Sequence, residues 1–272
     1  MRIGSNTRLL AVLGDPIAHS LSPTMHNAAL DALGVDAVYV ALRVSPGDFS
    51  DTFRALGALG IAGNVTVPHK EAAERDVTRK TDLCARAGAC NTYWVEQGAL
   101  VGDNTDVPAI AAELAELGVD GGHWLVVGTG GSARAAALAA ADARADLSVH
   151  SRDARRATDF AAWASGLGVN ARVAKPPYAA DLVVNATPLG LASGDPLPLD
   201  PDGLHGIRAA LDLVYGPGET RWARELRRRS IATRDGRGVL VRQGALAWER
   251  FFPDRPAPVE IMRAAVERAL RV

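Results

Sequence analysis

The sequence predicts an α/β protein built from two domains. Short β-rich runs alternate with helical patterns along nearly the whole chain, which is typical of a mainly parallel sheet with helices on its faces. The length of 272 residues is more than an average single domain needs. A fresh unit of strand, glycine turn and helix begins after residue 105, so we expect a domain boundary there.

Apolar runs bounded by turn residues predict the strands of the first domain. The runs cover residues 8–14, 37–44, 61–67 and 91–102. The last run is long enough to fold as a hairpin, with Gln97-Gly98 near its turn.

Proline, serine and glycine mark the helices between these strands. The helix over 22–34 has Ser22 as its expected N-cap, Pro23 at its first position and Gly34 after its last turn. The segment 45–57 repeats the Ser-Pro start and the Gly stop, so it is expected to form the next helix.

The second domain repeats the alternation of strands and helices. Strands are expected at 123–128, 147–152, 180–188 and 209–215, and helices at 130–143 and 154–168. The tail, residues 257–272, is an amphipathic helix with Val259, Met262, Val266 and Leu270 on one stripe.

Composition and charge exclude several classes of function. With 30 basic and 31 acidic residues the net charge is −1, which gives no attraction to nucleic acid or to an anionic membrane. No apolar run reaches the roughly 18–20 residues of a spanning helix, and the apolar segment near the N-terminus is too short for a signal peptide. Cys84 and Cys90 are spaced for neither a zinc site nor a redox pair, so we expect buried thiols, no metal and a cytoplasmic location.

A glycine-rich turn predicts a dinucleotide site in the second domain. The stretch "LVVGTGGSARAAALAA" matches G-x-G-x-x-A with Gly128, Gly130 and Ala133, and Gly131 adds a further glycine. The pattern directly follows an apolar strand and opens a helix. Glycine permits the tight turn and lets the backbone approach a pyrophosphate, while the helix N-terminus offers free N–H groups and a positive potential. In this context we expect a dinucleotide rather than a plain structural turn.

The end of the next strand indicates which dinucleotide binds. An NAD site usually has Asp or Glu there to hold the ribose 2′-OH. Here Ser151 takes that place and Arg152 follows it. Two more arginines, Arg155 and Arg156, are close by, and arginine binds a 2′-phosphate through paired hydrogen bonds. This favours NADP, while Asp153 would repel the phosphate and keeps NAD as an alternative.

Several apolar runs of the first half end in polar residues. Ligands of open parallel sheets bind beyond the carboxyl ends of the strands, so hydroxyls and amides gathered there suit a small ligand rich in hydroxyl groups. Taken singly, Lys70 would be a solvated lysine and Asp106 a favourable charge at a helix N-terminus. The residues concerned are Ser20, Ser22, Asn64, Thr66, Lys70, Asn91, Asn104, Thr105 and Asp106.

Eight motifs in order resemble the shikimate dehydrogenase family over nearly the whole chain. They are "HSLSP", "NVTVPHK", "ACNT", "GDNTD", "GTGGSARA", "NATPLG", "DLVYGPGET" and "RQGALAWERF". The resemblance implies reversible, NADPH-dependent reduction of 3-dehydroshikimate to shikimate, in the pathway to aromatic amino acids. Some members of the family instead oxidise quinate or shikimate with NAD, and this is the alternative function.

The resemblance also implies roles for particular residues. Lys70 matches the catalytic lysine and Asp106 its partner carboxylate, and we expect Lys70 to be the main proton donor; the neighbouring His69 is given no role. Groups that hold the substrate match Ser20, Ser22, Asn64, Thr66, Asn91, Tyr215 and Gln243. Groups on the dinucleotide side match Gly128, Gly130, Gly131, Ser132, Ala133, Ser151, Arg152, Arg156, Asn185, Thr187 and Gly238.

The family plan further implies a discontinuous first domain. Residues 1–105 plus 239–272 would bind the substrate, and residues 106–238 would form a Rossmann-type dinucleotide domain, with the active site in the cleft between the two. The expected partner is a small-molecule substrate, and the family contains both monomers and homodimers. The chain departs from the family pattern at Leu191, Val239 and Asp153, all on the dinucleotide side.

Overall fold

The computed structural model describes residues 3–271 and divides the chain into two compact units. The first unit extends to Thr105 and resumes at Leu240, and the second comprises Asp106–Val239. Each unit contains a six-stranded, mainly parallel sheet with helices, so the predicted α/β class is confirmed. Within residues 3–271 no helix is long and apolar enough to cross a membrane.

The sheet of the first unit has the strand order β2-β1-β3-β5-β6-β4. Its strands are β1 (Arg8–Gly14), β2 (Ala37–Arg43), β3 (Ala62–Val65), β4 (Arg79–Lys80), β5 (Thr92–Glu96) and β6 (Ala99–Asp103). β1 is parallel to β2 and β3, whereas β5 is antiparallel to β3 and β6. The predicted hairpin is confirmed, because Gln97 and Gly98 join β5 to β6 with φ of 52° and 77°, the positive values that a two-residue hairpin turn needs.

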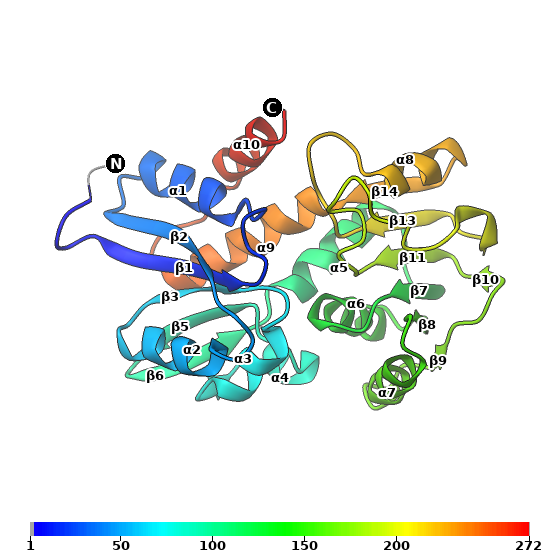
Figure 1. Cartoon of the computed structure of the whole chain (residues 1–272), viewed down its shortest axis with the longest axis horizontal. Helices are drawn as coiled ribbons and strands as arrows, with labels where there is room; N and C mark the ends of the chain where they lie inside the picture. The colour runs from blue at the N-terminus through cyan, green and yellow to red at the C-terminus, as the bar shows by residue number, and fades with distance from the viewer. Residues whose placement is uncertain (1–2, 272) are drawn as a thin grey trace. The chain divides into compact units, whose positions relative to one another are not determined.

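Helices cover both faces of this sheet. They are α1 (Ser22–Ala32), α2 (Phe49–Ala58), α3 (Lys70–Asp76), α4 (Asp82–Ala87), α9 (Gly236–Phe251) and α10 (Val259–Ala269). Figure 1 shows α1 and α10 together on one face of the sheet and α2 with α3 on the other. Of the predicted stripe in the C-terminal segment, Met262, Val266 and Leu270 are buried and Val259 is half-buried.

The start of α1 differs from the prediction. Leu21 stands at the N-cap and makes no capping hydrogen bond with its side chain, and Ser22 is the first residue of the helix. The hydroxyl of Ser20 accepts a hydrogen bond from the Ser22 N–H at 3.3 Å. Ser22 is therefore not the N-cap, and its buried hydroxyl is available for another task.

The bounds of α2 were also predicted wrongly. The Ser45 carbonyl accepts a hydrogen bond from Asp48 N–H at 3.1 Å, and the Ser45 hydroxyl donates to the Asp48 carboxylate at 2.6 Å. These bonds close a turn, so the helix begins only at Phe49. Gly57 lies inside the helix, and it is Gly60, with a φ of 74°, that follows its end.

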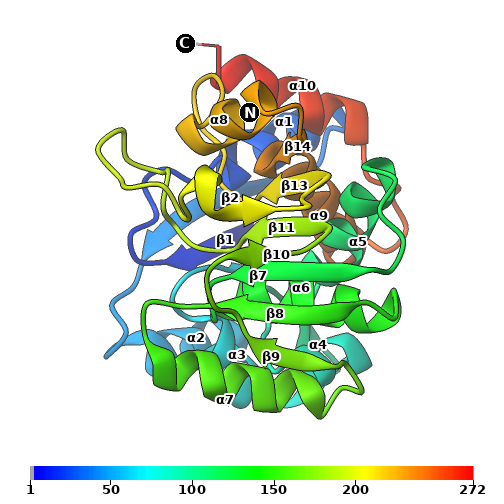
Figure 2. The same ribbon diagram turned by 90° about the vertical axis from the view of Figure 1, so that its right-hand side faces the viewer.

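The sheet of the second unit is wholly parallel and has the order β9-β8-β7-β11-β13-β14. The strands are β7 (His123–Val127), β8 (Asp146–His150), β9 (Ala171–Val173), β11 (Leu182–Asn185), β13 (Ala209–Asp212) and β14 (Ala232–Asp235). In chain order this sequence reads 3-2-1-4-5-6, which is the strand order of the Rossmann fold. Figure 2 shows the strands stacked in this way. The order reverses between β7 and β11, where such sheets bind ligands.

Alanine lets the helices of the second unit approach its sheet closely. They are α5 (Asp106–Glu116), α6 (Gly131–Asp142), α7 (Ala154–Ser165) and α8 (Arg221–Arg228). Six alanines of α6 are buried, at positions 133, 135, 136, 137, 139 and 140. Because these side chains are small, α6 packs close to the sheet and begins soon after β7 ends. The glycine turn between Val127 and Gly131 is therefore short.

Candidate active site

Asn91 is the centre of a buried polar network in the first unit. Its side-chain oxygen accepts a hydrogen bond from Thr105 N–H at 2.8 Å, and its amide donates to Thr105 Oγ1 at 3.0 Å. The same amide reaches Gln243 Oε1 at 3.4 Å. The structure therefore brings together two predicted substrate residues, Asn91 and Gln243, although 152 positions separate them in the sequence.

Asn64 belongs to the same network. Its amide nitrogen donates to the Asn91 carbonyl at 3.1 Å and to Thr92 Oγ1 at 2.9 Å, while its oxygen accepts from the Tyr39 hydroxyl at 2.6 Å. The orientation of the amide is fixed chemically, because the Asn91 carbonyl can only accept and so must face the nitrogen. Thr66 lies one residue beyond the end of β3 and is half-buried.

Lys70 is buried rather than solvated. It is the first residue of α3 and only 8% exposed, and its carbonyl accepts a hydrogen bond from Cys90 N–H at 2.8 Å. This bond holds the start of α3 against the segment that leads into Asn91. A lysine is rarely buried without a functional or structural reason, so the solvated-surface interpretation of Lys70 is wrong.

His69 has a structural role that the sequence did not reveal. It is buried, its Nε2 is hydrogen-bonded to the Val44 carbonyl at 2.8 Å, and its ring stacks on Phe49 with a centroid distance of 4.4 Å. These contacts fix the chain at the position directly before Lys70.

Asp106 opens α5 and belongs to the second unit. It is buried, and it follows directly on Thr105, whose N–H is bonded to Asn91. A carboxylate in the first turn of a helix is stabilised by the positive end of the helix dipole. Tyr215 also lies in the second unit and is half-buried, just after β13.

The glycine turn of the second unit has the geometry that a phosphate site needs. Gly128 has a φ of 114°, and a Cβ there would lie 2.9 Å from the Ala186 carbonyl oxygen, so no other residue fits. At Gly130 a Cβ would meet nothing within 4 Å, which leaves open space above the backbone. α6 begins at Gly131, and Ser132 and Ala133 follow in its first turn. The N–H groups at the start of α6 therefore border this space.

The carboxylate of Asp153 is used by the protein itself. It caps α7, accepting hydrogen bonds from Arg155 N–H at 2.9 Å and Arg156 N–H at 3.1 Å, while Ser151 Oγ accepts from Asp153 N–H at 3.3 Å. The positive helix N-terminus offsets the charge that was expected to repel a phosphate. Within residues 3–271 no carboxylate pairs with Arg152 or Arg156, and both are exposed.

Asn185 and Thr187 organise the loop that follows β11. Asn185 donates to Asp212 Oδ1 at 2.8 Å, and its oxygen accepts from Thr187 Oγ1 at 2.7 Å. Asp212 is wholly buried, and burial raises the pKa of its carboxyl although Thr220 and Asn185 donate to it. Gly238 is needed for space, because a Cβ there would collide with the carboxylate of Glu113.

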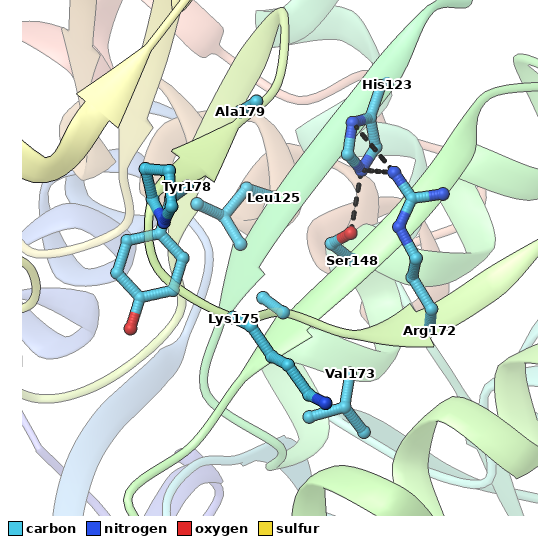
Figure 3. A pocket seen from close by; sticks show the side chains of 10 residues that line it. His123, Leu125, Ser148, Arg172, Val173, Lys175, Tyr178 and Ala179 are labelled. Carbon is cyan, nitrogen blue, oxygen red and sulfur yellow. Dashed lines mark hydrogen bonds between the residues drawn. The ribbon is translucent and has the colours of Figure 1, made fainter.

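A pocket of about 290 Å³ lies on one face of the second sheet, where β7, β8 and β9 meet the segment 174–179. Figure 3 shows His123, Arg172 and Lys175 around it, with the His123 Nε2 bonded to Ser148 Oγ at 2.7 Å. Burial and the nearby guanidinium of Arg172 lower the pKa of His123. No residue of the predicted site lines this pocket, so it is separate from the glycine turn. Within residues 3–271 no group of three His, Cys, Asp or Glu side chains is arranged to hold a metal.

Sequence reasoning missed four residues that shape the site. Three of them, Tyr39, Thr92 and Asp212, hydrogen-bond predicted site residues that lie 25, 28 and 27 positions away. The fourth, Thr105, was noted only as part of a polar cluster. Thr92, Thr105 and Asp212 lie inside quoted motifs, which was the only signal that could have found them. Tyr39 lies in no motif, and its burial is not visible in one sequence.

His26 completes the packing around Tyr39. It is wholly buried in α1, and its ring stacks on Tyr39 at 4.5 Å between centroids with an interplanar angle of 10°. The ring of Trp248 is also nearly parallel to that of His26, at 6.5 Å between centroids. Neither ring nitrogen has a hydrogen-bond partner within residues 3–271, and burial lowers the pKa of His26 to about 3. His26 is therefore neutral, and its role in the structure is to pack its ring against those of Tyr39 and Trp248.

Comparisons with known proteins agree along the whole chain. A family model described as "Shikimate dehydrogenase substrate binding domain" matches residues 12–93, and one described as "Shikimate 5'-dehydrogenase C-terminal domain" matches residues 236–267. A relative from Halobacterium salinarum, named shikimate dehydrogenase (NADP(+)), is 40% identical over 263 residues, which cover 95% of this chain and 98% of the relative. A relative of the same name from Moorella thermoacetica is 39% identical over 284 residues, which cover 99% of this chain and 96% of the relative.

Solved structures give the same result. A shikimate 5-dehydrogenase from Thermus thermophilus, in complex with NADP(H) and shikimate, has a TM-score of 0.86 and 34% identity, covering 97% of this chain and all of that one. The shikimate dehydrogenase of Mycobacterium tuberculosis has a TM-score of 0.81 and 29% identity, with 96% of this chain and 99% of that one covered.

The burial of His26 predicts a particular pH dependence of stability. The pKa is about 3 in the folded protein and about 6.5 in the unfolded chain, so between these values only the unfolded chain binds the proton. The free energy of unfolding should therefore fall as the pH drops from 7 to 5, by about 2 kcal/mol on account of this residue. In urea denaturation, the free energy of unfolding of the His26→Phe variant should therefore fall by about 2 kcal/mol less than that of the wild type over the same pH interval.

The exposed His205 offers the control for this measurement. A His205→Gln variant should follow the wild type at both pH values. Parallel pH profiles for wild type and His26→Phe would show that His26 does not titrate as described.

Proposed function

The chain belongs to the shikimate dehydrogenase family, and we propose that it catalyses the reversible, NADPH-dependent reduction of 3-dehydroshikimate to shikimate. The observation that supports this most is the buried network of amides and hydroxyls around Asn91, which is hydrogen-bonded through Cys90 to the start of the helix that carries Lys70. A site of this kind suits a substrate with several hydroxyl groups, because analogues that leave buried polar groups unpaired are rejected.

The substrate contacts are assigned to the first unit, with Tyr215 added from the second. Asn91 and Gln243 are both buried, and the Asn91 amide nitrogen lies 3.4 Å from Gln243 Oε1. Ser22 is buried without acting as a cap, which favours a ligand role for its hydroxyl over a structural one. The proposed contacts are Ser20, Ser22, Asn64, Thr66, Asn91, Tyr215 and Gln243.

The residues of the second unit fit NADP. The open space at Gly130 and the N–H groups at the start of α6 suit the pyrophosphate. Arg152 and Arg156, which are exposed and pair with no carboxylate of residues 3–271, suit the 2′-phosphate. We place Ser151 beside them and the nicotinamide end near Asn185, Thr187 and Gly238. Substrate binding is thus assigned to the unit that includes Lys70, and dinucleotide binding to Asp106–Val239.

Lys70 and Asp106 are assigned to the reacting oxygen. Bound NADPH would supply the hydride for the carbonyl carbon of the substrate, and the carbonyl oxygen would need a proton from the protein. The ammonium of Lys70 donates that proton from Nζ, and in the oxidation of shikimate the amine takes it back. Asp106 is assigned to the substrate hydroxyl. A positioned acid of this kind accelerates a reaction about a hundredfold to ten-thousandfold.

The second candidate is an NAD-dependent enzyme that oxidises quinate or shikimate. Asp153 was the residue that favoured NAD, and its carboxylate is bound to the N-terminus of α7. The curated relatives compared above are also named for NADP(+). Both points favour the NADP enzyme over this alternative.

The direct test is a steady-state assay of shikimate and quinate oxidation, each with NADP and with NAD. The proposal predicts the highest kcat/KM for shikimate with NADP. A higher value for quinate, or for either acid with NAD, would establish the second candidate, and no oxidation of either acid would overturn both.

Substitution of Lys70 tests the proton donor. Lys70→Ala should lower kcat about a hundredfold or more and change the KM for shikimate much less, since the lost proton transfer belongs to the chemical step. Lys80→Ala is the control, because Lys80 lies in the same unit and is ion-paired with Glu74 near the surface. A nearly unchanged kcat in Lys70→Ala would show that the assignment is wrong.

Substitution of Arg152 tests the 2′-phosphate site. Arg152→Ala should raise the KM for NADP about tenfold and leave the KM for NAD within a factor of two, because only NADP has the phosphate that the guanidinium binds. Arg155→Ala, three positions further along and paired with Asp159, should change neither value. Equal effects of Arg152→Ala on both cofactors would place the phosphate elsewhere.

A further inference from the structure

We propose that Tyr39 is a positioning residue of the substrate site, which acts on substrate recognition by holding the side chain of Asn64. The inference rests on the proposed function and adds a residue that the family resemblance did not supply. Tyr39 is not itself assigned a contact with the substrate. Its effect on recognition passes through Asn64.

The contact between the two residues is short and buried. Tyr39 is 1% exposed and Asn64 is 5% exposed, and the hydroxyl donates to the Asn64 oxygen at 2.6 Å. This is at the short end of the range for an O–H···O hydrogen bond. Burial raises the pKa of Tyr39 well above its usual value, so the hydroxyl keeps its proton and remains a donor.

The hydrogen bonds of Asn64 leave it one way to meet a ligand. Both N–H groups donate within the protein, to the Asn91 carbonyl and to Thr92 Oγ1, and Tyr39 takes one lone pair of the oxygen. Only the second lone pair remains, so Asn64 can accept a hydrogen bond from a substrate hydroxyl but cannot donate one. Without the Tyr39 hydroxyl, the oxygen loses its anchor and the amide is free to tilt or to bind water.

Tyr39 is itself held on two sides by α1. The side chain of Asn27 donates to the Tyr39 carbonyl at 2.8 Å and accepts from the Tyr39 N–H at 2.9 Å. β2 is an edge strand, so these two bonds replace the backbone hydrogen bonds that a further strand would make to Tyr39. His26 stacks on the phenol ring. The first residue of α1 is Ser22, a proposed substrate contact. The same helix therefore positions Ser22 and holds Tyr39, whose hydroxyl fixes the side chain of Asn64.

The chain provides a matched control in Tyr93. It lies in the same unit, is also wholly buried and packs edge-on against Phe53. Its hydroxyl has no hydrogen-bond partner within residues 3–271. Removing this hydroxyl therefore changes packing as little as removing that of Tyr39, but breaks no hydrogen bond.

The experiment compares Tyr39→Phe with Tyr93→Phe in shikimate oxidation with NADP, together with urea denaturation of each. Tyr39→Phe should lower kcat/KM for shikimate about tenfold, chiefly through KM, and leave the KM for NADP unchanged. Tyr93→Phe should stay within a factor of two of the wild type. Equal kinetics for the two variants, or a loss in Tyr39→Phe that is confined to stability, would overturn the inference.

A double-mutant cycle then shows whether Tyr39 acts through Asn64. The variant that combines Tyr39→Phe with Asn64→Ala should be no less active than Asn64→Ala alone, because the group that Tyr39 positions is already absent. Additive losses would overturn the inference, and if Asn64→Ala does not fold, the comparison with Tyr93→Phe decides. A wild type that does not oxidise shikimate overturns the proposed function and this inference with it, whereas an active wild type with unaltered Tyr39→Phe overturns the inference alone.

Discussion

The need to satisfy every buried amide and hydroxyl around Asn91 is the constraint on which the first unit depends. A buried polar group without a partner costs about 1–3 kcal/mol, so the side chains of this cluster can adopt only the arrangement in which donors and acceptors match. Asn91 is bonded to Thr105, and its peptide carbonyl is bonded to Asn64. The same network ends beside Asp106 and, through Cys90, at the backbone of Lys70. Its geometry thus exists before any ligand binds, and a substrate hydroxyl meets groups that are already oriented.

In the second unit, the candidate dinucleotide site depends mainly on backbone geometry. The turn after β7 needs a glycine at position 128 because its φ is positive and the Ala186 carbonyl leaves no room for a Cβ. The buried carboxylate of Asp212 ties the ends of β11 and β13 together through Asn185, and it accepts from Thr220 at the start of α8. Backbone N–H groups are then presented after β7, beside the point where the strand order reverses, and the exposed arginines follow the neighbouring strand β8. An anionic dinucleotide is held at this edge in folds of this kind.

Much of this could be predicted from the sequence, because apolar runs, proline and glycine report local structure. The hairpin at Gln97-Gly98, the glycine turn and seven other strands, β1, β2, β3, β7, β8, β11 and β13, were found in that way. The short strands β4, β9 and β14 were not predicted. The start of α2 was misplaced, since the bond between Ser45 and Asp48 competes with the helix and propensity does not reveal it. The role of Tyr39 could not be predicted at all, because its partner lies 25 positions away on a strand that is not adjacent in the sheet. Motif resemblance supplied the candidate residues, whereas only the structure showed which of them are bonded to one another.

A crystal structure of the protein with shikimate and NADP would test the central claim most directly, which is that the network around Asn91 is preformed and receives the substrate hydroxyls. The account predicts ring hydroxyls of shikimate within hydrogen-bond distance of Asn91 and Lys70. It also predicts that the bonds from Tyr39 to Asn64 and from Asn64 to Thr92 are kept. Shikimate bound away from these residues, or an Asn64 amide turned to donate to the ligand, would contradict it.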